Sequence, residues 1–595
     1  MSEPKYIVGI DLGTTNITVN EVAVAALEDE KPAVEAFPVL QEFAKGAVEE
    51  RDVLPSFLFQ RLQEKPALAW SRDLPFIVGE YARERGAEVP GRLVSSAKSW
   101  LCNTRVDRRE AILPWNAPAE VQKISPLAAQ AEYLAHVRLA WNAKFPKQKL
   151  ENQMVVVTIP ASFDAAARDL TVEAARQAGL PDVTLLEEPQ SAFYSWIGQT
   201  RVPWREQVKK GDVVLVVDVG GGTSDFSLIE IGEEGGDLVL NRVAVGNHIL
   251  LGGDNMDLTL AFHVKGKLEA AKKKIDTWQT VALSHACRKA KEALLSDPDR
   301  KSETIVVSGR GSSVIGGSVK STLERQEIED LLVDGFFPAC AFTDAPREDP
   351  ALGFREVNLS YAADAAITRH LAHFLRQQTG KPEYQYPKAI LFNGGVFLAK
   401  RFQDRLVEVI DGWLKEAGRD PVKVLEGTDL VRAVSAGAVH FGMAKRGKGI
   451  RIRGGVSQNY YLGVESALPA VPGLKPPLKA LCVAKMGTEE GSVTEVPKHV
   501  FGLVVGKPVE FKFYKSPARR EDEVGQLFDE VPADVEETSG LSSELPPQEG
   551  MAPGTVVNVN LQVGITEIGT LEIWCRQQGG DHRWKLEFNV RDAIR

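Results

Sequence analysis

The sequence contains Gly9-Ile10-Asp11-Leu12-Gly13-Thr14-Thr15-Asn16 near its beginning and Asp218-Val219-Gly220-Gly221-Gly222-Thr223-Ser224-Asp225 further along. Both segments follow an apolar run, at residues 6–8 and 213–217, and both place an Asp where the predicted strand ends, before Gly and Thr. Glycine permits φ > 0 and close backbone approach, so N–H groups and Thr hydroxyls can bind phosphate oxygens while the Asp holds Mg²⁺ through water. A single turn of this kind is more often an ordinary hairpin. The repeated order predicts a pair of phosphate-binding hairpins that clamp a nucleotide.

Composition places the chain among globular proteins with more than one domain. It has 595 residues, of which 44% are hydrophobic and 26% are charged, with a mean hydropathy of −0.16. The net charge of −10 argues against a general nucleic-acid binder, because phosphate backbones repel an acidic surface. No apolar run approaches the roughly 18 residues of a membrane span, and no signal-peptide core precedes the first strand, so we expect a cytoplasmic protein without a membrane partner. The five cysteines are far apart and are expected to be reduced.

The pattern from residue 6 to about residue 444 predicts an α/β architecture, because apolar strand-like runs alternate with amphipathic helices. The predicted elements include strands at 154–160, 183–186 and 389–393, and helices at 164–178, 189–196 and 400–416. Gly179 is a suitable residue to end the first of these helices. Parallel sheets are the expectation for this part of the chain.

The composition changes at residues 445–455, a basic stretch punctuated by glycines, where we place a linker. Beyond it the helical period disappears and strand-like alternation takes over, as in residues 508–514 and 555–561. This pattern predicts an antiparallel β domain over 456–595. Within it, residues 532–554 are rich in Pro, Ser, Glu and Gly and are predicted to form a long mobile loop.

Besides the two hairpins, further segments match one known protein family in the order in which they occur along the chain. They are Leu54-Pro55-Ser56, Val78-Gly79, Ser96-Ala97-Lys98, the run from Val157 to Arg168, Glu187-Glu188-Pro189-Gln190-Ser191-Ala192, Leu251-Gly252-Gly253-Asp254-Asn255-Met256-Asp257 and Lys289-Ala290-Lys291. On these segments the sequence resembles the seventy-kilodalton heat-shock (DnaK-type) chaperones. The resemblance implies an actin-like (ribonuclease H-like) two-lobed ATPase domain over residues 1–444, followed by an all-β sandwich that binds peptides.

The resemblance also implies a catalytic role for several polar side chains. Asp11 and Asp218 would hold Mg²⁺ through water, Lys98 would reach the γ-phosphate, and Glu188 would orient the attacking water. Asp225 would support the second hairpin from behind. Taken alone, a strand-end Asp is more often a turn cap and a lysine is usually a surface residue, so these roles depend on motif position.

Phosphate and nucleotide contacts are implied at the turns themselves. Thr14, Thr15 and Thr223 would bind phosphate oxygens, with Thr223 counted in the catalytic set. The other nucleotide-binding positions implied are Gly13, Asn16, Gly220, Gly221, Gly222, Gly252, Gly253, Arg288, Lys291, Glu292, Gly394 and Gly395. The expected ligands are ATP or ADP with Mg²⁺, and K⁺ is a further ion that the family admits. Pro160 and Arg168 match the family's relay between the nucleotide and the second domain.

The adenosine side departs from the family pattern. Leu398 stands where the family has an Arg that stacks on adenine, and Leu295 stands where a Ser is expected. On the facing helix, the usual order of acidic residue, Lys and Arg is replaced by Arg288, Lys291 and Glu292. Loss of a stacked cation–π contact of about 0.5–2 kcal/mol predicts a several-fold to roughly thirtyfold loss of affinity unless Arg288 compensates.

The β domain matches the family less specifically, at residues 461–465 and 523–528. The resemblance implies capture of unfolded or extended polypeptide by backbone hydrogen bonds and an apolar pocket. It also implies J-domain co-chaperones and nucleotide exchange factors as partners. The basic stretch 445–455 replaces the family's apolar linker, which puts the coupling between domains in doubt. We expect no helical lid after the last strand, and bound peptide should then leave quickly.

Two other functions remain open on the sequence alone. A sugar-type kinase on the same fold also has two phosphate turns, but it needs an acceptor-binding Asp and has no need of Lys98 or an appended β domain. A nucleotide-switched binding module without catalysis is favoured by the altered adenosine side and linker. A metal site at His370 and His373 is disfavoured because no third ligand lies nearby in the sequence. Trp574, Trp584 and Tyr460 are interpreted as core residues rather than as a ligand groove.

Overall fold

The computed structural model describes residues 3–589 with the exception of some short segments. The excepted segments are 63–64, 72–74, 104, 116, 200–202, 235–236, 308–317, 348–358, 360, 379–381, 428, 450–455, 457–458, 467–476, 486–487, 489–490, 498, 517–518, 520, 534, 539–540, 548–550 and 567–569. Most of the predicted linker 445–455 therefore lies outside the described residues, as does Val590 at the end of the last predicted strand. Among the described residues, no helix is both long enough and apolar enough to cross a membrane.

The chain divides into two compact units. The first comprises Met1–Ile229 and Ala244–Arg451, and the second comprises Glu230–Val243 and Ile452–Arg595. The candidate site lies wholly in the first unit.

The first sheet of the first unit has the order β11-β10-β1-β2-β3, with β6 paired to β2. The strands are β1 Tyr6–Leu12, β2 Asn16–Ala23, β3 Glu35–Ala36, β6 Val53–Pro55, β10 Met154–Ile159 and β11 Val183–Glu187. β1 runs parallel to β10 and antiparallel to β2, so the first glycine hairpin is the turn between β1 and β2. Ile7, Val8 and Ile10 have no exposed surface, as expected for an apolar strand inside a sheet.

The second sheet has the order β14-β13-β12-β17-β18. Its strands are β12 Val213–Val219, β13 Ser224–Glu234, β14 Asp237–Val245, β17 Ala389–Asn393 and β18 Lys423–Val424. β12 runs parallel to β17 and brings Asp218 level with Asn393 at the ends of both strands. The second glycine hairpin therefore opens at the carboxyl end of this sheet, which is where open α/β sheets bind ligands.

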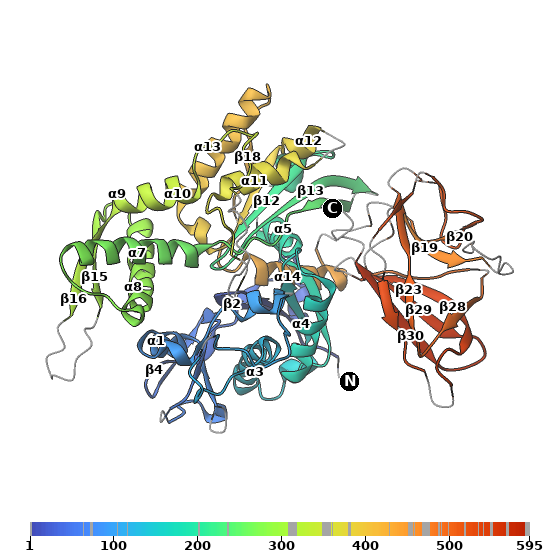
Figure 1. The fold of residues 1–595 in the computed structure, drawn as a ribbon, viewed down its shortest axis with the longest axis horizontal. Helices are drawn as coiled ribbons and strands as arrows, with labels where there is room; N and C mark the ends of the chain where they lie inside the picture. The colour runs from blue at the N-terminus through green and yellow to red at the C-terminus, as the bar shows by residue number, and fades with distance from the viewer. Residues whose placement is uncertain are drawn as a thin grey trace. The chain divides into compact units, whose positions relative to one another are not determined.

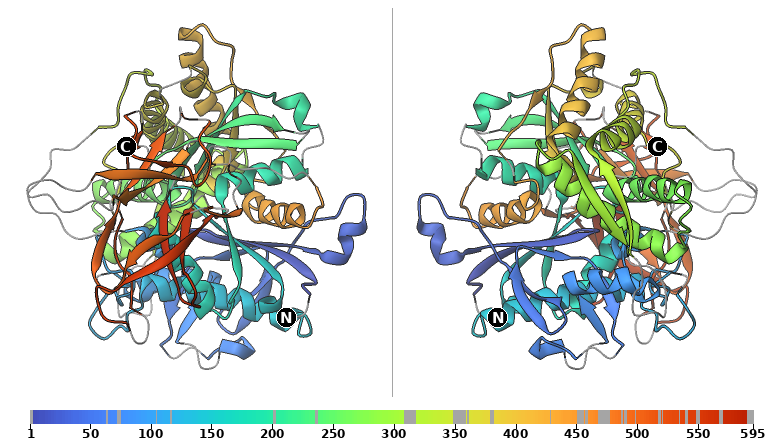
Figure 2. Two further views of the ribbon diagram at one scale, coloured as in Figure 1. Left: turned by 90° about the vertical axis from the view of Figure 1, so that its right-hand side faces the viewer. Right: turned by 90° about the vertical axis from the view of Figure 1, so that its left-hand side faces the viewer.

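Helix α14 (Ala433–Lys445) lies between the blue strands of the first sheet and the green strands of the second sheet in both views of Figure 2. It packs against β1 and against α5 (Glu188–Gln199) at glycines that permit close contact. A Cβ on Gly437 would lie 1.7 Å from Ser191 O, and a Cβ on Gly9 would lie 2.2 Å from Ser435 O. This packing fixes the position of Glu188 at the start of α5.

Several helix ends follow from local sequence. α4 (Ala165–Gln177) begins after Asp164, whose side chain accepts a hydrogen bond from Ala167 N, and it is followed by Gly179 with a φ of +83°. α13 spans Lys400–Glu416, the range that the sequence predicts. α7 (Gly253–Ala270) and α8 (Thr277–Ser296) pack together beside the hairpin of β15 (Ser302–Val307) and β16 (Val319–Glu324) (Figure 1).

The remaining described elements of the first unit are short or peripheral to the site. The α-helices are α1 Glu80–Glu88, α2 Ala97–Cys102, α3 Pro126–Lys144, α6 Trp204–Gln207, α9 Arg325–Ile328, α10 Asp334–Phe336, α11 Ile367–Arg376 and α12 Pro382–Gln385, and the short helical turns include the 3₁₀ helix η6 Gly395–Leu398. The strands are β4 Val39–Ala44, β5 Ala47–Arg51, β7 Leu58–Gln60, β8 Phe76–Val78 and β9 Leu93–Val94.

The second unit contains two five-stranded sheets that share one apolar core. One has the order β25-β20-β19-β24-β26, and the other has the order β21-β28-β29-β30 with β22 paired to β28. The strands are β19 Asn459–Glu465, β20 Leu478–Ala484, β21 Val493–Glu495, β22 Phe501–Val504, β24 Phe513–Ser516, β25 Leu527–Phe528, β26 Glu536–Glu537, β28 Val556–Ile565, β29 Thr570–Gln577 and β30 Arg583–Asn589. Leu481 of β20 and Ile573 of β29 belong to the same buried cluster.

Two details of the second unit differ from the sequence prediction. The stretch 532–554, predicted as one long loop, contains β26 and β27 (Leu541–Glu544). β27 pairs with β23 (Pro508–Phe511), so backbone pairing with a distant strand supplies order that the local composition does not indicate. The predicted single strand 508–514 is divided between β23 and β24, because β24 pairs instead with β19. Tyr460 and Trp584 are buried in the core, as the sequence interpretation has it.

Candidate active site

A cavity of about 720 Å³ lies in the first unit where the two glycine hairpins meet. Its size is within the range of small-molecule sites, roughly 300–1,000 Å³. Most of the residues that the sequence singled out line it. They are Asp11, Gly13, Thr14, Thr15, Asn16, Lys98, Glu188, Asp218, Gly220, Gly221, Thr223, Gly253, Arg288, Lys291, Glu292, Gly394 and Gly395.

The two hairpins face each other at van der Waals distance. A Cβ on Gly221 would lie 2.2 Å from Thr15 Cγ2, and a Cβ on Gly222 would lie 2.7 Å from Thr14 Cγ2. Gly220 N donates to Thr223 O at 2.9 Å and closes the second turn. The glycines therefore leave the space in which the threonine side chains of the first hairpin lie against the second.

Two further glycine turns pack onto the second hairpin. Gly253 N donates to Gly220 O at 3.0 Å, and a Cβ on Gly252 would lie 2.6 Å from the same oxygen. Gly394 has a φ of +90°, and a Cβ there would lie 2.3 Å from Val219 O. Gly222 and Gly252 are not among the lining residues, and their place is in this packing behind the surface of the cavity.

Lys98 and Glu188 form a buried ion pair inside the cavity. Lys98 Nζ donates to Glu188 Oε1 at 2.6 Å, and the side chains are 8% and 11% exposed. Burial alone lowers the pKa of Lys98, but Glu188 and Asp11 outweigh it, and the pKa lies above its ordinary value. Lys98 is therefore a fixed positive charge between the hairpins.

Asp11 and Asp218 are half-buried carboxylates that line the same cavity. Burial and the charge of Glu188 raise the pKa of Asp11 to about 7, while Lys98 and Thr158, whose hydroxyl lies 3.2 Å away, oppose the rise. Burial, Glu188 and Asp225 raise the pKa of Asp218 well above its ordinary value, although Asn393 donates to it at 2.6 Å. Three carboxylates around a single lysine give an excess of negative charge that suits a bound cation.

The donor set fits Mg²⁺ held mainly through water. In the part of the chain that the structure describes, no group of three or more His, Cys, Asp or Glu side chains is placed to bind a metal ion directly. Mg²⁺ usually keeps several waters and takes one or two carboxylates, and it binds substrate phosphates as well. Asp11 and Asp218 provide such carboxylates.

The histidine pair of His370 and His373 lies elsewhere in the first unit. His370 Nε2 lies 2.9 Å from Asp364 O, so the His370 ring is engaged within its own segment.

Asp225 lies behind the second hairpin rather than in the cavity wall. It accepts a hydrogen bond from Ser162 Oγ at 2.6 Å, and His248 Nδ1 lies 3.1 Å from the same oxygen. Burial raises the pKa of Asp225, but His248 and Ser162 outweigh it, and the pKa lies below its ordinary value. His248 was not predicted as a site residue, because its only signal in the sequence is that of a lone histidine shortly before the Gly252-Gly253 turn.

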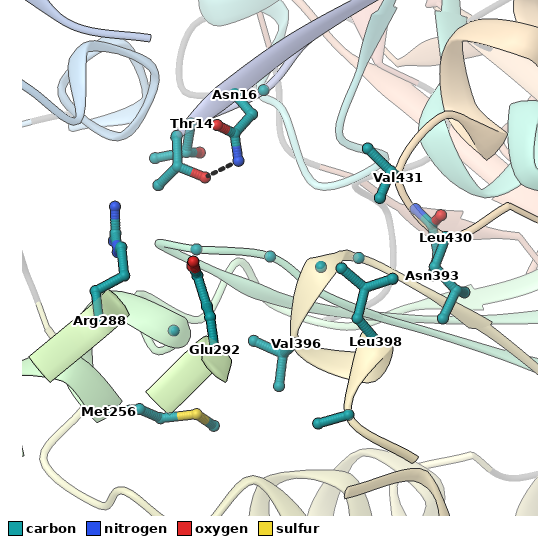
Figure 3. Close-up of a pocket in the computed structure, with 18 of the residues that line it drawn as sticks. Thr14, Asn16, Met256, Arg288, Glu292, Asn393, Val396, Leu398, Leu430 and Val431 are labelled. Atoms are coloured by element: carbon teal, nitrogen blue, oxygen red, sulfur yellow. Dashed lines mark hydrogen bonds between the residues drawn. The ribbon is translucent and has the colours of Figure 1, made fainter. Parts of the chain in front are cut away.

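The end of the cavity formed by α8 and η6 has a different character (Figure 3). Arg288 is bound by Asp254 and, at 2.6 Å, by Asp257, while Lys291 Nζ lies 2.6 Å from Asp257. Figure 3 shows Glu292 on the same helix as Arg288, with Val396 and Leu398 of η6 across from it. Sequence reasoning missed both aspartates as partners of the cations, although they lie within a segment that it quoted.

The comparisons with known proteins agree on one family. The family model described as Hsp70 protein matches residues 98–341. A chaperone protein HscA from Enterobacter sp. (strain 638) is 30% identical over 311 residues, which cover 51% of this chain and 44% of the relative. An HscA homolog from Bordetella pertussis is 29% identical over 338 residues, covering 55% and 46%, and HscA from Salmonella agona is 29% identical over 346 residues, covering 55% and 49%.

Two glycine hairpins that meet at a cavity lined by carboxylates are an arrangement of an α/β protein in which backbone N–H groups can bind an anion. Over residues 98–341 the chain is similar to the Hsp70 protein family, and over about half of its length it is similar to chaperone proteins named HscA. The matched part spans less than half the length of each of these curated relatives.

Proposed function

We propose that this protein is an ATP-dependent chaperone that hydrolyses ATP to ADP and phosphate in the first unit and binds unfolded or extended polypeptide in the second. The observation that carries the proposal is the buried pair of Lys98 and Glu188, held between two facing glycine hairpins and beside Asp11 and Asp218. Each part of that arrangement has a role in phosphoryl transfer to water, and the similarity of residues 98–341 to the Hsp70 protein family supports the same assignment.

The hairpins provide the phosphate site. Thr14 and Thr15 lie against Gly222 and Gly221, so hydroxyl and backbone N–H groups from both hairpins surround one space. Such nests of backbone donors bind anions. Mg²⁺ bound beside Asp11 and Asp218 would neutralise charge on the phosphates.

The side chains act mainly by position and charge. Lys98 is a buried cation that donates hydrogen bonds toward the transferring phosphoryl group. Glu188 and Asp218 are acceptors that orient the attacking water, and Asp218 can take its proton, since a carboxylate with a raised pKa is a suitable base near neutral pH. Preorganised charges in a site of low dielectric supply most of the catalysis in this reaction class.

The second unit is the proposed polypeptide site. It contains two sheets around one core, and an extended segment can add hydrogen bonds along a strand. A J-domain co-chaperone and a nucleotide exchange factor are proposed as partners from the resemblance to heat-shock chaperones, and the curated relatives are themselves named as chaperone proteins. The cytoplasmic location stays a prediction from the sequence.

The test is single-turnover hydrolysis of ATP with Mg²⁺, comparing wild type with Lys98→Ala, with and without an unfolded polypeptide. Hydrolysis that requires Lys98 and rises with polypeptide supports the full proposal. Hydrolysis that requires Lys98 but ignores polypeptide supports the ATPase and overturns the coupling. Acceleration by a sugar or polyol would indicate a kinase instead.

A second function is favoured by one observation. Two nitrogens of Arg288 are bound to carboxylates, and Leu398 provides no cation, so the adenosine side lacks the charged contacts expected from the family. A nucleotide-switched binding module that does not catalyse hydrolysis can function without these charged contacts on the adenosine side. It predicts nucleotide binding without any hydrolysis that depends on Lys98.

A further inference from the structure

The cavity has two chemically different ends. The phosphate end holds Lys98, Asp11 and Asp218, while the opposite end is formed by α8 and η6. If a nucleotide binds with its phosphates at the hairpins, its base must occupy the end formed by α8 and η6. The inference therefore rests on the proposed function and concerns the base that this end selects.

The cations of this end are already engaged. Arg288 Nε lies 2.6 Å from Asp257 Oδ2, and another of its nitrogens is bound to Asp254. Lys291 is buried, pairs with Asp257 at 2.6 Å and lies 3.4 Å from Gly253 O. The two cations and two aspartates neutralise one another. Neither cation can move toward a base without leaving a carboxylate with fewer partners.

The remaining walls combine apolar surface with one carboxylate. Val396, Leu398 and Leu295 line the cavity, and Leu398 is 60% exposed, so its side chain is available to a planar ring. Glu292 is exposed and lines the cavity, and Figure 3 shows its side chain rising from α8 beside that of Arg288, with Val396 and Leu398 across from it. Lys289 also lines the cavity, one position from Arg288, and its side chain is exposed.

We infer that the base end recognises a purine through N–H donors on its edge, which Glu292 accepts, and that guanine nucleotides bind at least as tightly as adenine nucleotides. An ionised carboxylate only accepts hydrogen bonds, so it needs donors on the ligand. Guanine presents two adjacent donors, N1–H and the N2 amino group, which match the two oxygens of a carboxylate. Adenine presents one amino group beside ring nitrogens that are acceptors and would face Glu292 unfavourably.

The experiment measures equilibrium dissociation constants of MgADP, MgGDP and MgIDP by calorimetry on the nucleotide-free full chain. MgGDP should bind wild type at least as tightly as MgADP. MgIDP has N1–H but no N2 amino group, so its dissociation constant from wild type should lie between the dissociation constants of MgGDP from wild type and from Glu292→Gln. Glu292→Gln should weaken MgGDP by about tenfold and change MgADP by less than about twofold, because a charged two-point contact is lost only for guanine.

Two control variants separate the base contact from general electrostatics. Glu416→Gln on α13 removes an exposed carboxylate outside the cavity wall and should change none of the constants. Lys289→Gln should shift the three nucleotides by equal factors, because Lys289 is not the base acceptor.

MgADP binding more than about twofold tighter than MgGDP to wild type would overturn the inference, as would equal changes for all three nucleotides in Glu292→Gln. Either result leaves the proposed ATPase intact when hydrolysis still requires Lys98. Failure of all three nucleotides to bind overturns both proposals, because the hairpins would then hold no nucleotide phosphates.

Discussion

Lys98 Nζ and Glu188 Oε1 lie 2.6 Å apart, and the two side chains come from α2 and α5, between which α3, β10, α4 and β11 lie in the sequence. The pair satisfies a cation and an anion that burial would otherwise penalise. Under the proposed function, an incoming phosphate would compete with Glu188 for the hydrogen bonds of Lys98. The proposal therefore links stability and ligand binding through one ion pair.

The first prediction separates those two effects. Lys98→Ala leaves Glu188 buried next to Asp11 and Asp218 with no cation, so the free energy of unfolding of the first unit should fall by about 3–5 kcal/mol. Lys98→Met combined with Glu188→Gln removes both charges and should restore most of that stability. Denaturant unfolding and single-turnover hydrolysis are measured on each variant. The double variant should be stable but inactive; recovery of hydrolysis in it would contradict the role of Lys98.

The second prediction concerns pH. Asp11 has a folded-state pKa of about 7, above the ordinary 3.8, so between these values the folded state binds more protons than the unfolded state. Stability therefore falls as pH rises from about 4 to about 7 and stays reduced above that range. Asp11→Asn removes the penalty and should stabilise the nucleotide-free first unit at pH 8. The gain should shrink toward pH 4, where the wild-type carboxyl is neutral in both states.

Thermal unfolding at pH 5, 6.5 and 8 checks this sign. Asp29→Asn is a suitable control, because Asp29 is exposed and outside the cavity. A gain for Asp11→Asn that is the same at every pH would contradict the argument. The variant should also bind MgADP more weakly, because the stabilised site has lost one of the carboxylates that fit Mg²⁺.

The sequence predicted the hairpins and strand ends because these depend on short-range rules. Gly221 and Thr15 could be identified as turn residues from glycine and strand patterns alone, and α13 was predicted with its observed bounds. Their contact with each other depends on how the two sheets pack, which no local pattern specifies. The same holds for Asp257, which lies in a recognisable segment but pairs with Arg288 and Lys291 only because α7 packs on α8. β27 was missed because its partner strand is distant in sequence.

The third prediction tests the fit of the hairpins. In Gly221→Ala the new Cβ would lie 2.2 Å from Thr15 Cγ2 and 2.5 Å from Thr15 Oγ1, so one hairpin must move. We expect MgADP affinity to fall by at least about tenfold, since small displacements of phosphate donors are costly. Gly412→Ala is the matched control, because nothing lies within 4 Å of its Cβ and it lies inside α13. It should leave affinity unchanged and add up to about 1 kcal/mol of stability.

An additional variant distinguishes a steric cause from loss of backbone freedom at Gly221. Thr15→Ser removes Cγ2, the atom that a Cβ on Gly221 would meet most closely. Combined with Gly221→Ala, it should recover part of the lost affinity. If the double variant binds MgADP as weakly as Gly221→Ala alone, the contact between the hairpins is not the reason for the loss.

The fourth prediction concerns the second unit, where Tyr461 Oη donates to Asp522 Oδ2 at 2.7 Å and Arg519 Nε donates to the same oxygen at 2.7 Å. Tyr461 has no exposed surface and Asp522 is 7% exposed, so Tyr461→Phe leaves a buried carboxylate with one donor fewer. The free energy of unfolding of this unit should fall by about 1–3 kcal/mol. Tyr514→Phe is the matched control, because Tyr514 packs in the same buried cluster, and it should cost less than about 0.5 kcal/mol. Equal losses for the two variants in urea unfolding would show that the ring, and not the hydrogen bond to Asp522, carries the stability.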